Sequence, residues 1–176
     1  VLAQAGSFVP AEKARLGLVD AIFSRVGAKD DLFHSRSTFM VEMTETAELL
    51  HRATPRSFVI ADEIGRGTNT SVGLSVAFSV LYTLVMRIQC RSLFATHYYE
   101  LADILSENVS NEVEIQALCR AIEFYCTRLE KQGDAMSFSH RVRPGVNRVS
   151  HGLDIARLAD MPHDTIRIAE HMHTWL

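Results

Sequence analysis

A run of apolar residues that ends in two adjacent carboxylates is the feature that most constrains this chain. Phe58-Val59-Ile60-Ala61 leads directly into Asp62-Glu63, and the glycine-containing turn Ile64-Gly65-Arg66-Gly67-Thr68 follows. A short apolar run bounded by turn residues predicts a strand buried on both faces, as in a parallel sheet. Ligands of such sheets bind beyond the carboxyl ends of the strands, which is where the two acids should lie.

This pattern is typical of the Walker B motif of a P-loop ATPase. In that motif Asp62 would hold Mg²⁺, directly or through water, and Glu63 would orient and polarise the attacking water. A strand that simply ends in a solvated acidic turn explains the same residues. The rest of the chain has to decide between these two interpretations.

Size and charge narrow the class of protein. The chain has 176 residues, of which 47% are apolar, enough for one domain with a real core. With 18 Lys and Arg against 21 Asp and Glu, its net charge of −3 argues against a main nucleic-acid surface. The three cysteines have neither metal-ligand spacing nor a disulfide pattern, so we expect reduced thiols in an intracellular protein.

We expect no contact with a membrane. The most apolar segment, Leu74 to Met86, is too short to span one and carries Ser and Thr. Val1 to Ala5 is typical of the last turns of a helix, which Gly6 ends, and the chain does not begin with Met. We therefore expect a fragment.

Apolar spacing and turn residues predict alternating strands and helices up to residue 105. A helix that begins at Ser37-Thr38 and is closed by Pro55 should bury a stripe that includes Phe39, Met40, Met43 and Ala47. The expected strands are Val19–Val26, the run into Asp62 and Arg91–Thr96, and the other helices are Leu74–Met86 and Tyr98–Leu105. This order predicts a parallel sheet with crossover helices and an apolar, well-buried Leu74–Met86.

The pattern changes after Ser106. A polar turn, Lys131 to Asp134, predicts a hairpin between Ile122–Leu129 and Met136–Val142, although Ala117 to Arg120 would suit a helix as well. Two helices should follow, one over about His151 to Ala159 and one begun by Pro162.

Two more short motifs could carry chemistry. Ser37 and Thr38 stand at a helix start, where they either cap free N–H groups or help to bind an anion. His97 follows a strand that neighbours the carboxylates, where it either senses a phosphate or is a structural residue.

Taken together, these motifs resemble the MutS mismatch-repair ATPases. Ser37–Thr46, Asp62–Thr68 and Phe94–Tyr98 occur in that family's order and at its spacing, and the likeness covers nearly the whole chain. Cys90–Phe94 and Arg143–Arg148 are most similar to the mitochondrial homologues of fungi.

The resemblance implies an ABC-type P-loop ATPase that works as a dimer with ATP and Mg²⁺. Ser37 and Thr38 would reach the γ-phosphate bound by the partner subunit. Asp62 and Glu63 would act on the nucleotide of their own subunit, with His97 beside its γ-phosphate.

Three further residues receive roles from the same resemblance. The turn that contains Arg66 and Thr68 would face its counterpart across the dimer, with Arg66 linking the sites and Thr68 near ATP. His140 would pack against adenine, although a strand histidine that faces solvent is an equally simple account.

The resemblance also implies the organisation of the chain and its partners. Residues 1–148 would form a partial ATPase domain, and residues 149–176 a helical segment at the dimer interface. Mismatched double-stranded DNA would bind through domains outside this chain. We expect a mitochondrial location, with the nucleus as the alternative.

One motif of the family is absent from this sequence. It contains no Gly-x-x-x-x-Gly-Lys-Ser/Thr phosphate loop, which in the family lies just upstream of the segment that begins here at Val1. We therefore expect weak ATP binding by the fragment itself.

Two other functions stay open. One is a nucleotide-binding subunit of a transporter or chromosome-structuring ATPase, although Ser37-Thr38-Phe39 stands where transporters carry Leu-Ser-Gly-Gly-Gln. The other is a dimerisation module without catalysis.

Overall fold

The computed structural model describes residues 1–26, 37–105, 113–132, 135–148 and 150–175. The chain divides into one unit of residues 1–123 and a second of residues 124–176. The predicted loop over residues 28–35 lies outside the described residues. The predicted boundary at residue 148 was drawn from motifs rather than from packing, and it stays a prediction.

A three-stranded parallel sheet organises the first unit. Its order is β1 (Ile22–Arg25), β2 (Phe58–Asp62) and β3 (Arg91–Ala95). Arg25 pairs with Ala61, and Asp62 pairs with Ala95, so all three strands end at the same edge. The predicted parallel direction of the strands is confirmed.

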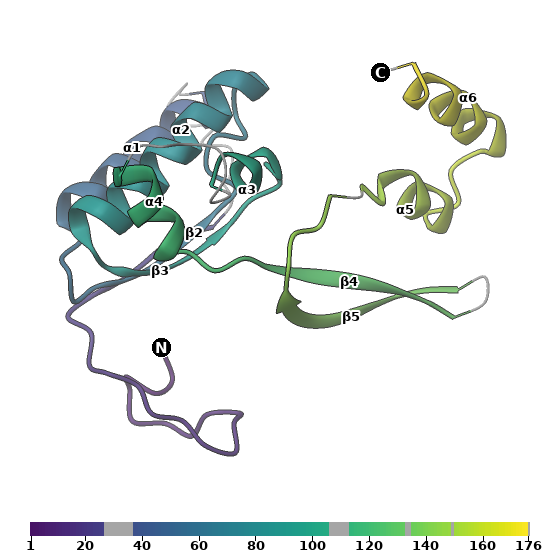
Figure 1. Ribbon diagram of the computed structural model, residues 1–176. Coiled ribbons are helices and arrows are strands. Elements are labelled where there is room, and N and C mark those ends of the chain that lie inside the picture. The colour runs from purple at the N-terminus through teal and green to yellow at the C-terminus, as the bar shows by residue number, and fades with distance from the viewer. Residues whose placement is uncertain (27–36, 106–112, 133–134, 149, 176) are drawn as a thin grey trace. The chain divides into compact units, whose positions relative to one another are not determined.

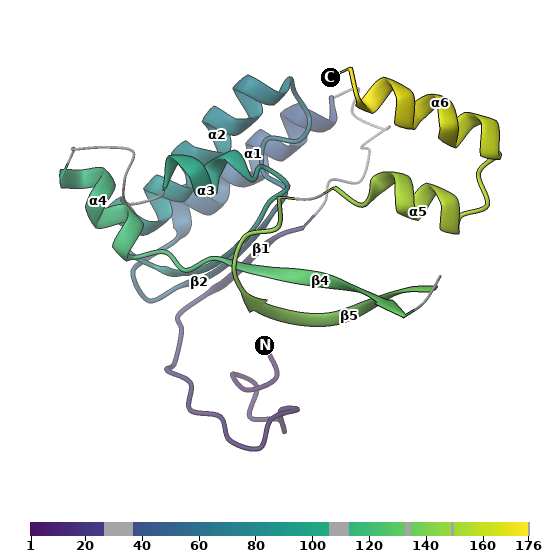
Figure 2. The same ribbon diagram turned by 45° about the vertical axis from the view of Figure 1, so that its right-hand side comes forward.

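Helices connect these strands or follow the last of them, and they lie along one side of the sheet in both views (Figure 1, Figure 2). They are α1 (Thr38–Arg52), α2 (Thr70–Tyr82) with its π-helical continuation η1 (Thr83–Ile88), α3 (Glu100–Ile104) and α4 (Val113–Arg120). The segment Ala117–Arg120, for which the sequence left helix and strand open, is therefore helical. The expected N-terminal helix end is a single hydrogen-bonded turn, closed by Gly6 at a φ of +75°.

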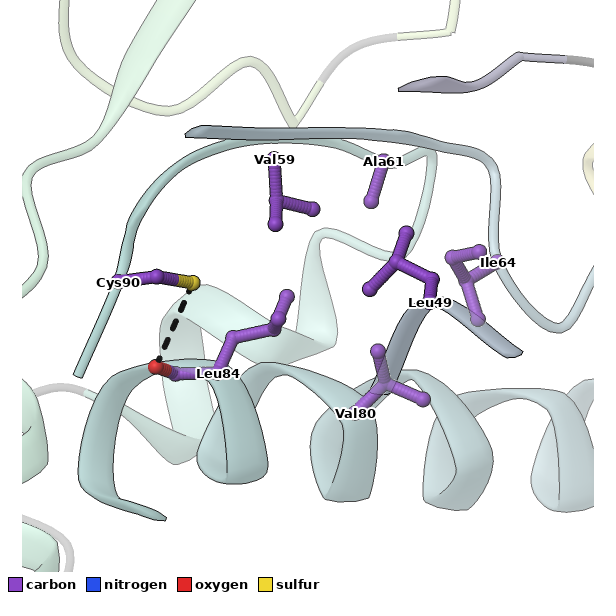
Figure 3. Close-up of a cluster of buried hydrophobic side chains, with 7 residues drawn as sticks. All are labelled: Leu49, Val59, Ala61, Ile64, Val80, Leu84 and Cys90. Atoms are coloured by element: carbon purple, nitrogen blue, oxygen red, sulfur yellow. Dashed lines mark hydrogen bonds between the residues drawn. The ribbon is translucent and has the colours of Figure 1, made fainter. Parts of the chain in front are cut away.

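The core lies between β2 and the helices that cover it. Figure 3 shows Val59 and Ala61 pointing from β2 toward Leu49 of α1 and toward Val80 and Leu84 below them. Val59 and Leu84 are completely buried. The opposite-facing Phe58 and Ile60 are only half-buried, so the expected burial of this strand on both faces is met on one face.

The buried face of α1 differs from the predicted one. The structure buries Glu42, Thr46 and Leu49, whereas Met40 is 56% exposed and Ala47 is exposed. The predicted buried face of α1 was wrong because the prediction considered only apolar residues. A carboxylate can take a core position when it has polar partners there, and Glu42 has them.

The helix after the carboxylate loop is longer and less buried than predicted. α2 and η1 form one continuous helix over Thr70–Ile88, which is long and apolar enough by length and composition to cross a membrane. This corrects the expectation that the segment is too short. Ala77, Val80 and Leu84 of this helix pack in the hydrophobic clusters of the first unit. The absence of a membrane contact stays a prediction.

Hydroxyl groups fix the start of β2. Ser57 donates to Asp20 at 2.8 Å, and Thr54 donates to the other oxygen of the same carboxylate. The Thr54 bond first and the Ser57 bond second lower the pKa of Asp20 below its ordinary value. This contact ties the segment before β1 to the segment before β2, beside the backbone bond from Phe58 N–H to Ala21.

The second unit contains a hairpin and two helices. β4 (Tyr125–Gln132) pairs antiparallel with β5 (Ala135–Pro144), as predicted, and the turn residues 133–134 lie outside the described part. α5 (Gly152–Leu158) and α6 (His163–His173) follow, joined by an ion pair between Arg157 and Glu170. Pro162 directly precedes α6 as its N-cap residue.

Candidate active site

The carboxyl edge of the parallel sheet gathers the predicted catalytic residues of β2 and β3. Asp62 ends β2 and is half-buried, and the N–H of Glu63 donates to Ala95 O at 2.9 Å. Within the described part of the chain, the Asp62 carboxylate has no hydrogen-bond or ion-pair partner. Both oxygens of the Asp62 carboxylate are therefore available to bind a metal ion or another ligand.

Glu63 adopts an unusual backbone conformation. Its φ is +51°, in the left-handed region that residues other than glycine rarely occupy. The bond to Ala95 and a bond from Arg66 N–H to Glu63 O at 3.3 Å hold this conformation. Strain of this kind costs on the order of 1–3 kcal/mol and concentrates at functional sites. Here it directs the chain out of the sheet immediately after Asp62.

The predicted interface residues of the turn lie on its surface. Arg66 has a 69% exposed side chain, which forms an ion pair with Glu63 of the same chain. Thr68 is half-buried. An exposed ion pair of this type contributes little to stability, so the Arg66 side chain is free to exchange Glu63 for another partner.

Glycines let the turn pack closely on its neighbours. Gly65 has a φ of +90°, and a Cβ there would lie 2.8 Å from the carbonyl carbon of Gly73 in α2. A Cβ on Gly67 would lie 3.1 Å from the Cβ of Phe39. The first turns of α1 and α2 are therefore both packed against this turn.

Ser37 is confirmed as the N-cap of α1. Its Oγ accepts from Met40 N–H at 3.2 Å, and both Ser37 and Thr38 are exposed. The cap leaves other N–H groups of the first turn directed outward, where they can interact with an anion. The contact between Gly67 and Phe39 places this helix start beside the turn that follows Glu63.

His97 lies at the same edge as Asp62, two residues beyond the end of β3. It is exposed, and its ring lies 4.2 Å from the ring of Tyr98 between centroids. Tyr98 itself is 3% exposed and donates from its hydroxyl to Gly65 O at 2.9 Å. Burial first, and then the carboxylates of Glu42, Glu100 and Glu63, raise the pKa of Tyr98 above its usual value. Its hydroxyl therefore remains a donor at neutral pH.

His140 is not brought to this site by any described contact. It lies on β5 in the second unit, and its side chain lies outside the described residues. Its proposed adenine contact stays a prediction.

Two buried charged residues were missed as site residues by sequence reasoning. Glu42 is 4% exposed and accepts from Gly65 N–H at 2.5 Å. Arg25, at the end of β1 and also 4% exposed, lies 3.9 Å from Glu42 and 3.1 Å from Glu45 between charged atoms. The spacing Glu42, Thr46, Leu49 was the available signal, since it is helical and points all three side chains to one face.

The donor set fits a magnesium ion bound with a nucleotide. Mg²⁺ takes oxygen ligands and is usually held by one or two carboxylates together with phosphates and waters. In the described ranges, no group of three or more His, Cys, Asp or Glu side chains is arranged to hold a metal by itself. A single strand-end carboxylate such as Asp62 is sufficient for the phosphate-assisted mode.

A parallel sheet with paired carboxylates at its carboxyl edge and a capped helix start beside them defines an α/β domain of the P-loop ATPase type. The comparisons specify the family. The model of MutS domain V, which has this type of fold, matches residues 1–176. The chain belongs to the MutS domain V family.

The chain is also similar to bacterial proteins named DNA mismatch repair protein MutS. It is 47% identical over 166 residues to the protein of Anaeromyxobacter sp. (strain Fw109-5) and 46% over 170 residues to that of Symbiobacterium thermophilum. It is 45% identical over 172 residues to that of Desulforamulus reducens. These alignments cover 94%, 96% and 98% of this chain but 18% of each relative. The chain thus spans about a fifth of the length of these relatives.

Substitution of Gly65 tests the geometry of the turn. Gly65→Ala should destabilise the domain by about 2 kcal/mol or more, since it adds left-handed strain and a contact with the Gly73 backbone. Gly17→Ala is the matched control, because Gly17 has open space around its missing Cβ and the change should be neutral or slightly stabilising. Thermal unfolding of the full-length protein measures both. Equal midpoints for the two variants would contradict this geometry.

Proposed function

We propose that this chain is the ATPase portion of a DNA mismatch-repair protein. ATP binding and hydrolysis between two subunits would drive a clamp on mismatched DNA, which is held by parts of the protein outside this chain. The observation that carries the proposal is the strand-end pair Asp62 and Glu63, packed beside the start of α1 and beside the end of β3. Family membership and the names of the relatives support it.

The proposed role of Asp62 is to bind Mg²⁺, directly or through one water. Its carboxylate has no partner among the described residues, which supports a role toward a ligand. Bound Mg²⁺ supplies charge neutralisation to the phosphates of ATP.

The proposed role of Glu63 is to orient and polarise the water that attacks the γ-phosphate. The left-handed backbone at Glu63 supports this role, because it turns the residue away from the strand direction immediately beside Asp62. His97, exposed at the same edge, would sense the γ-phosphate rather than act as the base.

Further residues would contact nucleotide at the proposed interface between the subunits. Ser37 and Thr38 would contact the γ-phosphate of the partner's nucleotide, using the exposed N-terminus of α1. Arg66, exposed and paired only weakly with Glu63, would link the two sites, with Thr68 near ATP. His140 would pack against adenine.

The second unit supports a role in subunit contact. Several large apolar side chains of its helical region are 44% or more exposed: Ile155, Leu158, Met161, Ile168, Met172 and Trp175. Exposed apolar side chains on adjacent helices favour an interface. We therefore propose that residues 149–176 contact a second MutS-type subunit, which we expect to be an identical chain.

The activity is proposed for the full-length protein rather than for this chain alone. The sequence has no Gly-x-x-x-x-Gly-Lys-Ser/Thr loop to cradle the phosphates, so this chain by itself should bind ATP weakly. The segments Cys90–Phe94 and Arg143–Arg148 underlie our proposal of a fungal mitochondrial branch and a mitochondrial location. A nuclear location is the alternative.

Glu63→Gln in the full-length protein tests the catalytic assignment. ATP should still bind within about twofold of wild type, whereas hydrolysis should fall by roughly 10²–10⁴-fold, because only the water-orienting carboxylate is lost. A single-turnover assay measures this, with the exposed Glu48→Gln on α1 as the control for removal of a carboxylate. Wild-type turnover by Glu63→Gln would sink the assignment.

Ser37→Ala separates a phosphate contact from a simple helix cap. The variant should weaken ATP-driven association of subunits more than ATP binding to one subunit. Ser37→Asn is the control, because Asn caps a helix as well as Ser does but alters the group offered to the phosphate. Sedimentation velocity with and without ATP measures association. If Asn restores association fully, Ser37 is only a cap.

A further inference from the structure

One residue, Gly65, connects the three motifs of the proposed site through its two backbone polar groups. The N–H of Gly65 donates to Glu42 Oε1 at 2.5 Å, and the C=O of Gly65 accepts from Tyr98 Oη at 2.9 Å. Glu42 lies on α1 behind its Ser37 cap, and Tyr98 directly follows His97. Gly65 itself is two residues beyond Glu63. Both backbone polar groups of Gly65 are therefore bound to side chains, one from α1 and one from the segment between β3 and α3.

The contact of α1 with Gly65 is made by a buried charged side chain, Glu42, and not by apolar packing. Glu42 and its neighbour Arg25 are each 4% exposed. Burying such a pair costs free energy that a well-packed apolar pair would not cost. A carboxylate in this position supplies direction instead: its oxygen fixes where the Gly65 N–H lies.

The Tyr98 hydroxyl is closely packed against the backbone of Gly65 and Gly73. This group lies so close to Gly73 that a Cβ on this glycine would collide with it, and with the backbone oxygen of Gly65. The Tyr98 ring is also packed in the cluster with Ala77 and Leu101. A shift of Gly65 therefore has to move its partners as well, since closely packed interiors transmit displacement.

We propose that Glu42 and Tyr98 are positioning residues that couple α1 to the Glu63 carboxylate through the backbone of Gly65. This inference rests on the proposed ATPase function. The N-terminus of α1 would contact the nucleotide of the partner subunit, whereas Glu63 acts on the nucleotide of its own. The position of α1, which depends on whether ATP occupies one site, is then transmitted by the bond between Glu42 and Gly65 to the Glu63 carboxylate of the other site. Tyr98 keeps the loop that contains His97 aligned with α1 and with the turn after Glu63.

Removing the Tyr98 hydroxyl in the full-length protein is the direct test. Tyr98→Phe should lower kcat for ATP hydrolysis about tenfold, because the buried Gly65 carbonyl loses its donor. KM and ATP affinity should change less than about twofold. Tyr99→Phe is the matched control, since Tyr99 is 48% exposed and adjacent. It should keep wild-type values.

Substitution of Glu42 provides the second arm. Glu42→Ala should lower kcat at least as much as Tyr98→Phe, whereas Glu42→Gln, which keeps an oxygen acceptor for Gly65, should recover a large part of it. Glu48→Gln controls for removal of a carboxylate from α1. The double variant Glu42→Ala/Tyr98→Phe should be no slower than the slower single variant, because both act through the backbone of one residue, Gly65.

The outcomes separate this coupling from the proposed function. If wild type hydrolyses ATP and Glu63→Gln does not, but Tyr98→Phe keeps a wild-type kcat, the coupling is wrong and the function stands. Multiplicative losses in the double variant likewise overturn the coupling. If wild type has no ATPase activity, the proposed function itself fails. Thermal unfolding identifies a variant that does not fold, and if Tyr98→Phe is one, the Glu42→Ala and Glu42→Gln pair decides by the same criteria.

Discussion

The parallel pairing of β2 between β1 and β3 is the constraint on which the rest of the structure depends. It buries Val59 and Ala61 against the helices and brings the ends of all three strands to one edge. The same pairing sets Asp62 opposite Ala95, and the next backbone bond holds Glu63. A polar, strained turn can form at this edge because the strand beneath it is fixed by its core.

Hydrogen bonds and ion pairs, which depend on direction, then position the residues that the sheet brings to its carboxyl edge. The turn after Glu63 is anchored in the core by Ile64, and it is held further by Glu42 and Tyr98 at Gly65. Arg25, at the end of β1, accompanies the buried Glu42 charge. β1 thus ends in a residue of this connected polar group, and the segments that follow β2 and β3 contribute Gly65 and Tyr98 to it. Desolvation of these buried charged groups costs free energy, which is acceptable only where precise geometry matters more than stability.

Much of the fold could be predicted from local pattern. The strand before Asp62, the Ser37 cap and the hairpin all follow from short apolar runs, caps and turns, which are local properties of sequence. The face that α1 buries could not be predicted in this way. Glu42 takes a core position because Gly65, far away in sequence, offers it a partner, and only the folded chain brings them together. The extended helix Thr70–Ile88 was underestimated for a related reason: its polar first turn is capped by Asn69, and the apolar pattern begins later.

The site could be predicted as three separate motifs but not as a connected unit. Asp62, Glu63, Ser37 and His97 were each singled out as candidates from residue type and position, whereas the proposed roles of Tyr98, Glu42 and Arg25 depend on contacts between elements. Arg66 is an intermediate case: its exposure fits the predicted interface role, but the structure pairs it with Glu63.

The most direct test of the central claim is a crystal structure of the full-length protein with Mn²⁺ and a non-hydrolysable ATP analogue. Mn²⁺ takes the place of Mg²⁺ and can be located by its anomalous scattering. We expect the metal to bind an Asp62 oxygen, directly or through one water, and the Glu63 carboxylate to have left Arg66 for a water in line with the γ-phosphate. A metal bound without Asp62, with Glu63 still paired to Arg66 and directed away from the phosphate, would contradict this expectation.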